Sequence, residues 1–123
     1  MMVRMVVITM VFLGLWGSLA FAGEADVIAV EKKAEGERVY QFAVTVRHAD
    51  TGWDHYADKW EVVDEKGAVL GTRVLLHPHV DEQPFTRSLS VVRIPEGINK
   101  VTVRAHDSVH GYGGETVIVD LPK

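Results

Sequence analysis

The sequence contains no cysteine among its 123 residues. This absence excludes disulfides, Cys-ligated zinc, iron–sulfur clusters and thiol catalysis. Basic residues are outnumbered, with 13 Lys and Arg against 17 Asp and Glu, and a net charge of −4 argues against a nucleic-acid binder held by phosphate contacts. The length fits one domain, and an aromatic share of 8% with plentiful Val and Ile argues against disorder. Six histidines remain as the unusual feature.

The first 22 residues are typical of an export signal. One positive charge, Arg4, precedes an uncharged apolar run that ends in Ala20-Phe21-Ala22, the small-x-small pattern of a signal-peptidase site. We therefore predict a signal peptide over 1–22, a cut before Gly23 and a mature domain over 23–123. The protein would be periplasmic or secreted, with no membrane attachment after cleavage. The alternative is a retained anchor, because the run is near the length that spans a bilayer.

The predicted cut also removes every methionine, since all four lie within the first ten residues. The mature domain then contains no sulfur, and any metal site in it must use nitrogen and oxygen ligands. Ligand chemistry alone excludes a thiolate or thioether copper(I) carrier.

Apolar and polar residues alternate with a period of two through the mature chain, which predicts β-strands. The clearest alternation puts Tyr40, Phe42, Val44 and Val46 on one face. Seven strands are expected, at 26–32, 38–48, 59–63, 68–76, 85–93, around 101–105 and 117–121. Seven short strands in about a hundred residues indicate an all-β, seven-stranded antiparallel sandwich of immunoglobulin type.

The histidines fall in alternate loops of this predicted sandwich. The first, third and fifth loops (33–37, 64–67 and 95–97) are short turns without histidine. The second, fourth and sixth are long, and they contain or border all six histidines: His48, His55, His77, His79, His106 and His110. Because consecutive loops of an up-and-down sandwich lie at opposite ends, all six imidazoles are expected at one end.

Imidazole and carboxylate together suit a divalent transition metal such as Fe, Cu(II) or Zn. We expect His48, His55 and His110 as first ligands, with His77, His79, His106 or Asp107 completing the set. The alternative is that these side chains bind nothing, being solvated loop imidazoles or partners of loop carbonyls. No local motif such as a His-Glu-x-x-His helix is present to decide between the two readings.

The stretch 47–67 resembles the metal-site segment of superoxide reductases of the desulfoferrodoxin type. His48, His55, Tyr56 and Trp60 stand in comparable places, and His110-Gly111 matches the end of that family's Cys-x-x-His-Gly motif. The resemblance implies a mononuclear iron and superoxide-reductase-like redox handling. Asp107 stands where that family has its cysteine ligand, and the family's N-terminal histidine ligand has no counterpart here. The likeness therefore supports a metal-site geometry more than that activity.

A second likeness is to the Z subunit of the periplasmic sulfur-oxidation carrier complex, also an immunoglobulin-like domain. The stretches 47–52, 77–78, 83–85 and 101–111 are similar to that subunit's Arg-His-Pro-Met-Glu-Thr-Gly, His-Pro and Asn-Pro-Tyr/Phe segments and its closing strand and loop. This resemblance implies a metal-free module that binds another periplasmic protein. In that reading Trp53, Tyr56, Phe85 and Tyr112 would dock a protein or a small polar ligand.

Overall fold

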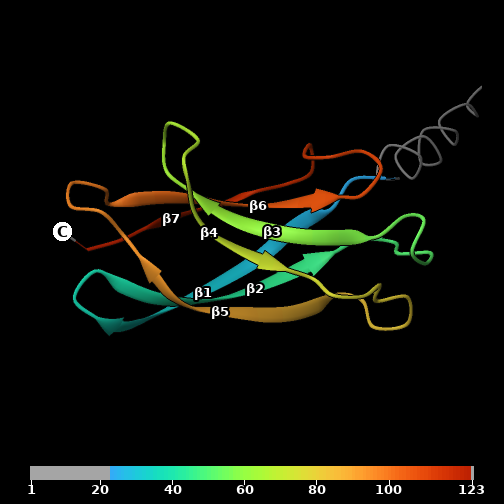
Figure 1. Cartoon of the computed structure of the whole chain (residues 1–123), viewed down its shortest axis with the longest axis horizontal. Helices are drawn as coiled ribbons and strands as arrows, with labels where there is room; N and C mark the ends of the chain where they lie inside the picture. Colours follow the sequence, from blue (N-terminus) through green and yellow to red (C-terminus); the bar gives the residue numbers. More distant parts are fainter. Residues whose placement is uncertain (1–22, 123) are drawn as a thin grey trace, which may run out of the picture.

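The computed structural model describes residues 23–122 and shows two packed antiparallel sheets (Figure 1). The three-stranded sheet has the order β1-β2-β5, and the four-stranded sheet has the order β4-β3-β6-β7. The strands are β1 (Asp26–Gly36), β2 (Val39–Arg47), β3 (Ala57–Val63), β4 (Val69–Val74), β5 (Phe85–Arg93), β6 (Lys100–Asp107) and β7 (Val117–Asp120). The prediction of a seven-stranded β-sandwich is confirmed. The predicted signal peptide lies outside the described residues.

The core lies between the two sheets and contains Trp60, Phe42 and Phe85, which are all at most 2% exposed. Among the described residues, its buried members run from Ala25 to Leu121. Burial alternates strictly along β2 and β6, as the period-two pattern predicts. No helix within residues 23–122 has the length and hydropathy that crossing a bilayer requires.

The predicted hairpin over 64–67 is present between β3 and β4. Oδ1 of Asp64 accepts hydrogen bonds from the backbone N–H groups of Lys66 (2.9 Å) and Ala68 (2.8 Å). Gly67 has a φ of +87°, the left-handed conformation that glycine adopts without strain. The side chain of Asp64 and the freedom of Gly67 together explain the tight turn.

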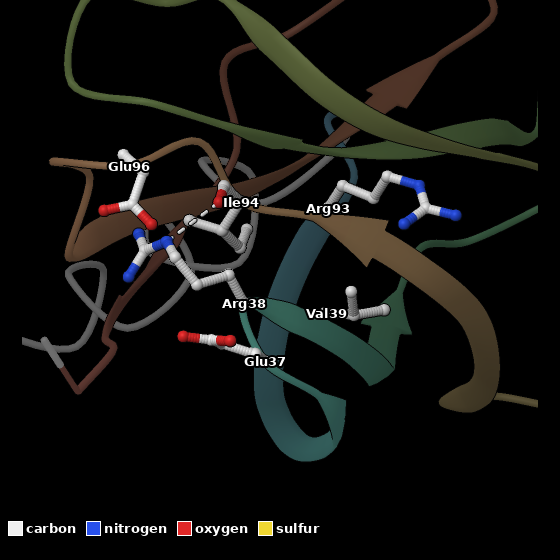
Figure 2. A pocket seen from close by; sticks show the side chains of 6 residues that line it. All are labelled: Glu37, Arg38, Val39, Arg93, Ile94 and Glu96. Atoms are coloured by element: carbon white, nitrogen blue, oxygen red, sulfur yellow. Dashed lines mark hydrogen bonds between the residues drawn. The ribbon is translucent and has the colours of Figure 1, made fainter.

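β1 extends four residues beyond its predicted end at residue 32, so the first turn is shorter than the predicted loop over 33–37. Gly36 still pairs with Val39 as the last residue of β1, so Glu37 and Arg38 make the turn, and the positive φ of 58° falls on Arg38. Its guanidinium donates to the carbonyl oxygen of Ile94 at 3.0 Å (Figure 2). It also donates to the carbonyl oxygen of Pro95 at 2.7 Å, and the two bonds hold this conformation. A hollow of about 300 Å³ lies beside Arg38, where this side chain connects the β1–β2 turn to the β5–β6 turn.

The loops sort to the two ends of the sandwich as predicted. The β1–β2, β3–β4 and β5–β6 turns lie at one end, and the longer β2–β3, β4–β5 and β6–β7 loops lie at the other, the right-hand end in Figure 1. All six histidines are on or beside those three longer loops. The fold thus brings every imidazole to the same end of the molecule.

Candidate metal centre

His48, His55 and Asp107 come together at the histidine-rich end. One nitrogen of each imidazole and one oxygen of the carboxylate all lie within 4.8 Å of one another. His48 directly follows β2, Asp107 ends β6, and His55 stands on the loop that precedes β3. The group therefore joins one loop of the molecule to the ends of strands from both sheets.

His48 is held between two carboxylates and is 4% exposed. Its Nδ1 lies 2.5 Å from Oδ1 of Asp50, and its Nε2 contacts Oδ2 of Asp107. Burial lowers the pKa of His48, but hydrogen bonds to Asp50 and Asp107 outweigh burial and raise it above the ordinary value. In the metal-free protein His48 is thus stabilised as an imidazolium that donates to both acids.

His55 is positioned by a tight turn at the tip of the β2–β3 loop. Its N–H donates to the carbonyl of Gly52 (3.2 Å), and its carbonyl accepts from the N–H of Thr51 (3.0 Å). This turn directs Nε2 to within 2.7 Å of Oδ2 of Asp107. Both imidazoles therefore meet the same carboxylate oxygen.

Asp107 is fully buried and uses its two oxygens differently. Oδ1 accepts from the backbone N–H groups of Val109 (2.6 Å) and His110 (2.8 Å), which shapes the β6–β7 loop. Oδ2 faces the two imidazoles. Burial raises the pKa of Asp107, but the hydrogen bonds from these backbone and imidazole groups lower it below its usual range, so this carboxylate is ionised.

These donors fit a divalent transition metal. Two imidazole nitrogens and one carboxylate oxygen are the ligand types that Zn, Fe, Cu(II) and Ni accept. Asp50, which bonds the far nitrogen of His48, completes the carboxylate–histidine arrangement that orients metal-binding imidazoles. An ion would take the place of the protons that now lie between Oδ2 of Asp107 and the two Nε2 atoms.

His110 lies beside the group rather than inside it. Its ring centroid is 5.1 Å from that of His55, and its side chain is exposed to solvent. It is thus within reach of the same site, although the three-residue cluster does not include it.

The other three histidines lie apart from this group, contrary to their place in the predicted ligand set. His106 points to the outer face of the four-stranded sheet, where its Nδ1 lies 2.7 Å from Oδ1 of Asp58. His77 is exposed, and its ring lies 4.7 Å from that of His79. His79 is buried and stacks on Phe85 with 3.9 Å between ring centroids.

His79 is a neutral packing residue. Its Nε2 accepts from the guanidinium of Arg87 at 3.0 Å, which requires an unprotonated nitrogen. Burial lowers the pKa of His79, and the positive charges of Arg87 and His77 lower it further, against smaller opposite effects from Glu82 and Asp50.

The residues expected to contact a partner also separate. Trp53 is 67% exposed and packs edge-on against Tyr56 at 5.5 Å. Phe85 belongs to the core at 2% exposure, so its prediction as a contact residue is corrected. Tyr112 lies over the outer face of the four-stranded sheet, where its hydroxyl donates to Glu61 (2.9 Å).

Glu61 is only 5% exposed, although it is a charged residue of β3. Arg104 donates to its carboxylate at 3.0 Å and stacks over the ring of Tyr112, 4.1 Å from its centroid. Burial raises the pKa of Glu61, but the hydrogen bonds from Tyr112 and Arg104 lower it below its usual range. The β6–β7 loop thus folds back over charged strand positions and covers them.

A cavity of about 650 Å³ opens beside His48. Its lining includes Gly23, Glu24, Asp26 and Glu115 as well as Arg47. Three acidic residues and one arginine line the cavity beside His48, and this excess of negative charge favours the approach of cations.

Two residues at the site were not in the predicted ligand set. For Asp50 the sequence does contain a signal, because the spacing His48-Ala49-Asp50 is short enough for a local imidazole–carboxylate pair. Gly23 carries no side chain and gave no sequence signal. Its carbonyl oxygen lies 3.0 Å from Nε2 of His48 and 3.4 Å from Nε2 of His55.

Comparisons with known proteins find one curated relative and two similar solved structures, and no protein-family model matches the sequence. The relative is a protein of Halomicrobium mukohataei, described as a candidate lipoprotein, with 47% identity over 97 residues. The match covers 79% of this chain and 47% of the relative, so the chain spans about half the length of the relative.

The two structures are each 17% identical to this chain. A hypothetical protein from Pyrococcus horikoshii has a TM-score of 0.49 and covers 82% of this chain and 94% of its own. A superoxide reductase in the oxidised state has a TM-score of 0.48, and the match covers 81% of this chain and 90% of the reductase chain. The likeness to the sulfur-oxidation Z subunit receives no support from these comparisons.

Proposed function

We propose that this protein is an exported domain that binds one divalent transition metal ion through His48, His55 and Asp107. The observation that carries the proposal is the convergence of two imidazoles on one oxygen of a buried carboxylate, with Asp50 bonded to the far nitrogen of His48. A carboxylate behind a ligating imidazole fixes its tautomer and raises its basicity. The pairing of Asp50 with His48 is therefore the arrangement that a metal-binding imidazole needs.

Export is supported by the predicted signal peptide and by the relative described as a candidate lipoprotein. The metal-site segment resembles that of the superoxide reductases, which favours iron. Redox handling of a small substrate such as superoxide would require Fe or Cu here, because zinc has no redox chemistry. The identity of the bound metal therefore decides between redox handling and a storage, delivery or structural role.

The test is elemental analysis of untagged protein, followed by titration of the metal-free form with Zn, Cu(II) and Fe(II). One equivalent of at least one metal should bind with submicromolar affinity. His55→Ala should abolish tight binding, whereas His77→Ala, which removes an exposed histidine of the same end, should leave it unchanged. Asp107→Asn tests the oxygen ligand while retaining an acceptor for the backbone bonds of Val109 and His110. Affinities weaker than micromolar for all three metals would reject the proposal.

The exposed Trp53, which packs against the half-buried Tyr56, favours a second candidate, a metal-free module that docks another exported protein. Large aromatic residues are enriched where interfaces derive their binding energy. In that case Trp53→Ala would abolish partner capture, and His55→Ala would not.

A further inference from the structure

Gly23 sits at the mouth of the candidate metal centre. Its carbonyl oxygen is 3.0 Å from Nε2 of His48 and 3.4 Å from Nε2 of His55. These are the nitrogen atoms that face Asp107. The backbone of Gly23 thus contributes an oxygen atom to the group that the three side chains form.

Glycine is required at this position by the space around it. In the uncleaved chain the φ of Gly23 is +113°, a conformation that residues with a side chain rarely adopt, and cleavage before Gly23 removes this torsion. A Cβ atom built there would lie 2.8 Å from Nε2 of His110. The imidazole of His110 therefore occupies the space of a side chain, and Gly23 is enclosed by three histidines.

Gly23 is also the residue that the sequence predicts as the first of the mature chain, because Ala20-Phe21-Ala22 precedes it as a cleavage pattern. Cleavage there converts the peptide nitrogen of Gly23 into a primary amine. Only two carbon atoms separate this nitrogen from the carbonyl oxygen of the same residue, so both can bind one ion in a small chelate ring. A protonated peptide nitrogen, in contrast, is a poor metal ligand because its lone pair is delocalised into the carbonyl group.

We propose that the α-amino group of Gly23, released by removal of the signal peptide, is a ligand of the metal bound by His48, His55 and Asp107. This inference rests on the proposed metal-binding function. It places a third nitrogen donor in the site and makes the tight metal site a property of the processed protein. The unprocessed precursor would retain only the side-chain ligands and the carbonyl oxygen.

The test compares two proteins that contain the whole buried core, which runs from Ala25 to Leu121. One begins at Gly23, and the other carries the single additional residue Ala22. Both have a free amino terminus and the same charge, so they differ only in where the amine lies. A direct ligand should contribute at least as much as an outer hydrogen-bond partner, so the extension should weaken Cu(II) and Zn affinity by about 10–100-fold.

A spectroscopic readout separates ligation from a change in folding. Cu(II) serves as the paramagnetic probe, and both proteins are labelled with ¹⁵N-glycine. Electron paramagnetic resonance measures the hyperfine couplings between Cu(II) and its nitrogen ligands. These couplings should change with the label in the protein that begins at Gly23 and not in the extended protein. Circular dichroism and denaturant unfolding of the metal-free forms should be the same for the two.

The outcomes are distinct. Equal submicromolar affinities, with no effect of the glycine label, would overturn the inference and leave the proposed function standing. Failure of both proteins to bind any of the metals would reject the proposed function and the inference together. Tighter binding by the processed form, with a label-dependent coupling, would establish the amine as a ligand.

Discussion

Replacement of Asp50 tests how the candidate metal centre is positioned, because Asp50 orients His48 and is not itself one of the proposed ligands. Its Oδ1 lies 2.5 Å from Nδ1 of His48 and accepts from the N–H of Ala57 at 3.0 Å. Its Oδ2 accepts from the N–H of His79 at 2.7 Å. One buried carboxylate thus positions a metal-binding imidazole and connects two loops.

Asp50→Asn keeps the shape of this side chain but supplies only one acceptor oxygen. The amide NH₂ must then face either the N–H of His79 or the donors of His48 and Ala57, so a buried donor loses its acceptor. Loss of a hydrogen bond to a charged group costs about 1.5–3 kcal/mol, and we expect the free energy of unfolding of the metal-free protein to fall by that amount.

Metal affinity should fall as well, because His48 loses the partner that orients it. Outer carboxylate partners of ligating histidines typically contribute about 10–100-fold in affinity. This range corresponds to about 1.4–2.8 kcal/mol of binding free energy. Isothermal titration of the folded, metal-free variant with Zn or Cu(II) measures the change, and denaturant unfolding measures the stability separately.

The chain offers a matched control in a second histidine–carboxylate pair. Nδ1 of His106 lies 2.7 Å from Oδ1 of Asp58, a pair outside the candidate metal centre. Asp58→Asn should therefore leave metal affinity unchanged. Wild-type affinity in Asp50→Asn, or an equal loss in Asp58→Asn, would refute the assignment of Asp50 as the positioning residue.

Two further predictions concern residues outside the centre. Tyr112→Phe removes one donor from the buried carboxylate of Glu61, so denaturant unfolding should show a loss of about 1–2 kcal/mol, and an unchanged midpoint would contradict the packing of Tyr112 on the sheet. The lowered pKa of His79 means that the unfolded chain binds a proton there which the folded chain resists. The stability that neutral His79 contributes is therefore present above pH ~6.5 and is lost as the pH falls through its folded pKa. Unfolding titrations of the wild type and His79→Gln should diverge in this acidic window, and parallel curves would argue against a neutral His79.

The period-two pattern of the strands predicts which site residues are buried, which the positions of the histidines in the loops do not. Along β2 the core parity of Val44 and Val46 continues to His48, which is buried. Along β6 the parity of Val103 and Ala105 continues to Asp107, also buried. The same parity places His106 on the outer face, which is why it lies apart from the group although it is adjacent to Asp107 in sequence.

Other features of the site could not be read from the pattern. The burial of His79 on Phe85 depends on how the β4–β5 loop folds back, and a segment with two prolines and three acidic or amide residues gave no periodicity. The role of Gly23 depends on its backbone carbonyl and on the space that His110 fills. A backbone carbonyl group, and a contact between residues far apart in the chain, leave no pattern of residue types in the sequence.

The position of the centre follows from this parity and explains why it couples to the fold. His48 continues the inner face of the three-stranded sheet, and Asp107 continues the inner face of the four-stranded sheet, so their contact closes the open end of the sandwich. Without metal, this closure depends on a protonated His48 between two carboxylates. A metal ion at the same atoms would replace that proton and link the two sheets directly. Binding free energy at such a position adds to the stability of the native state, since the unfolded chain does not keep the ligands together.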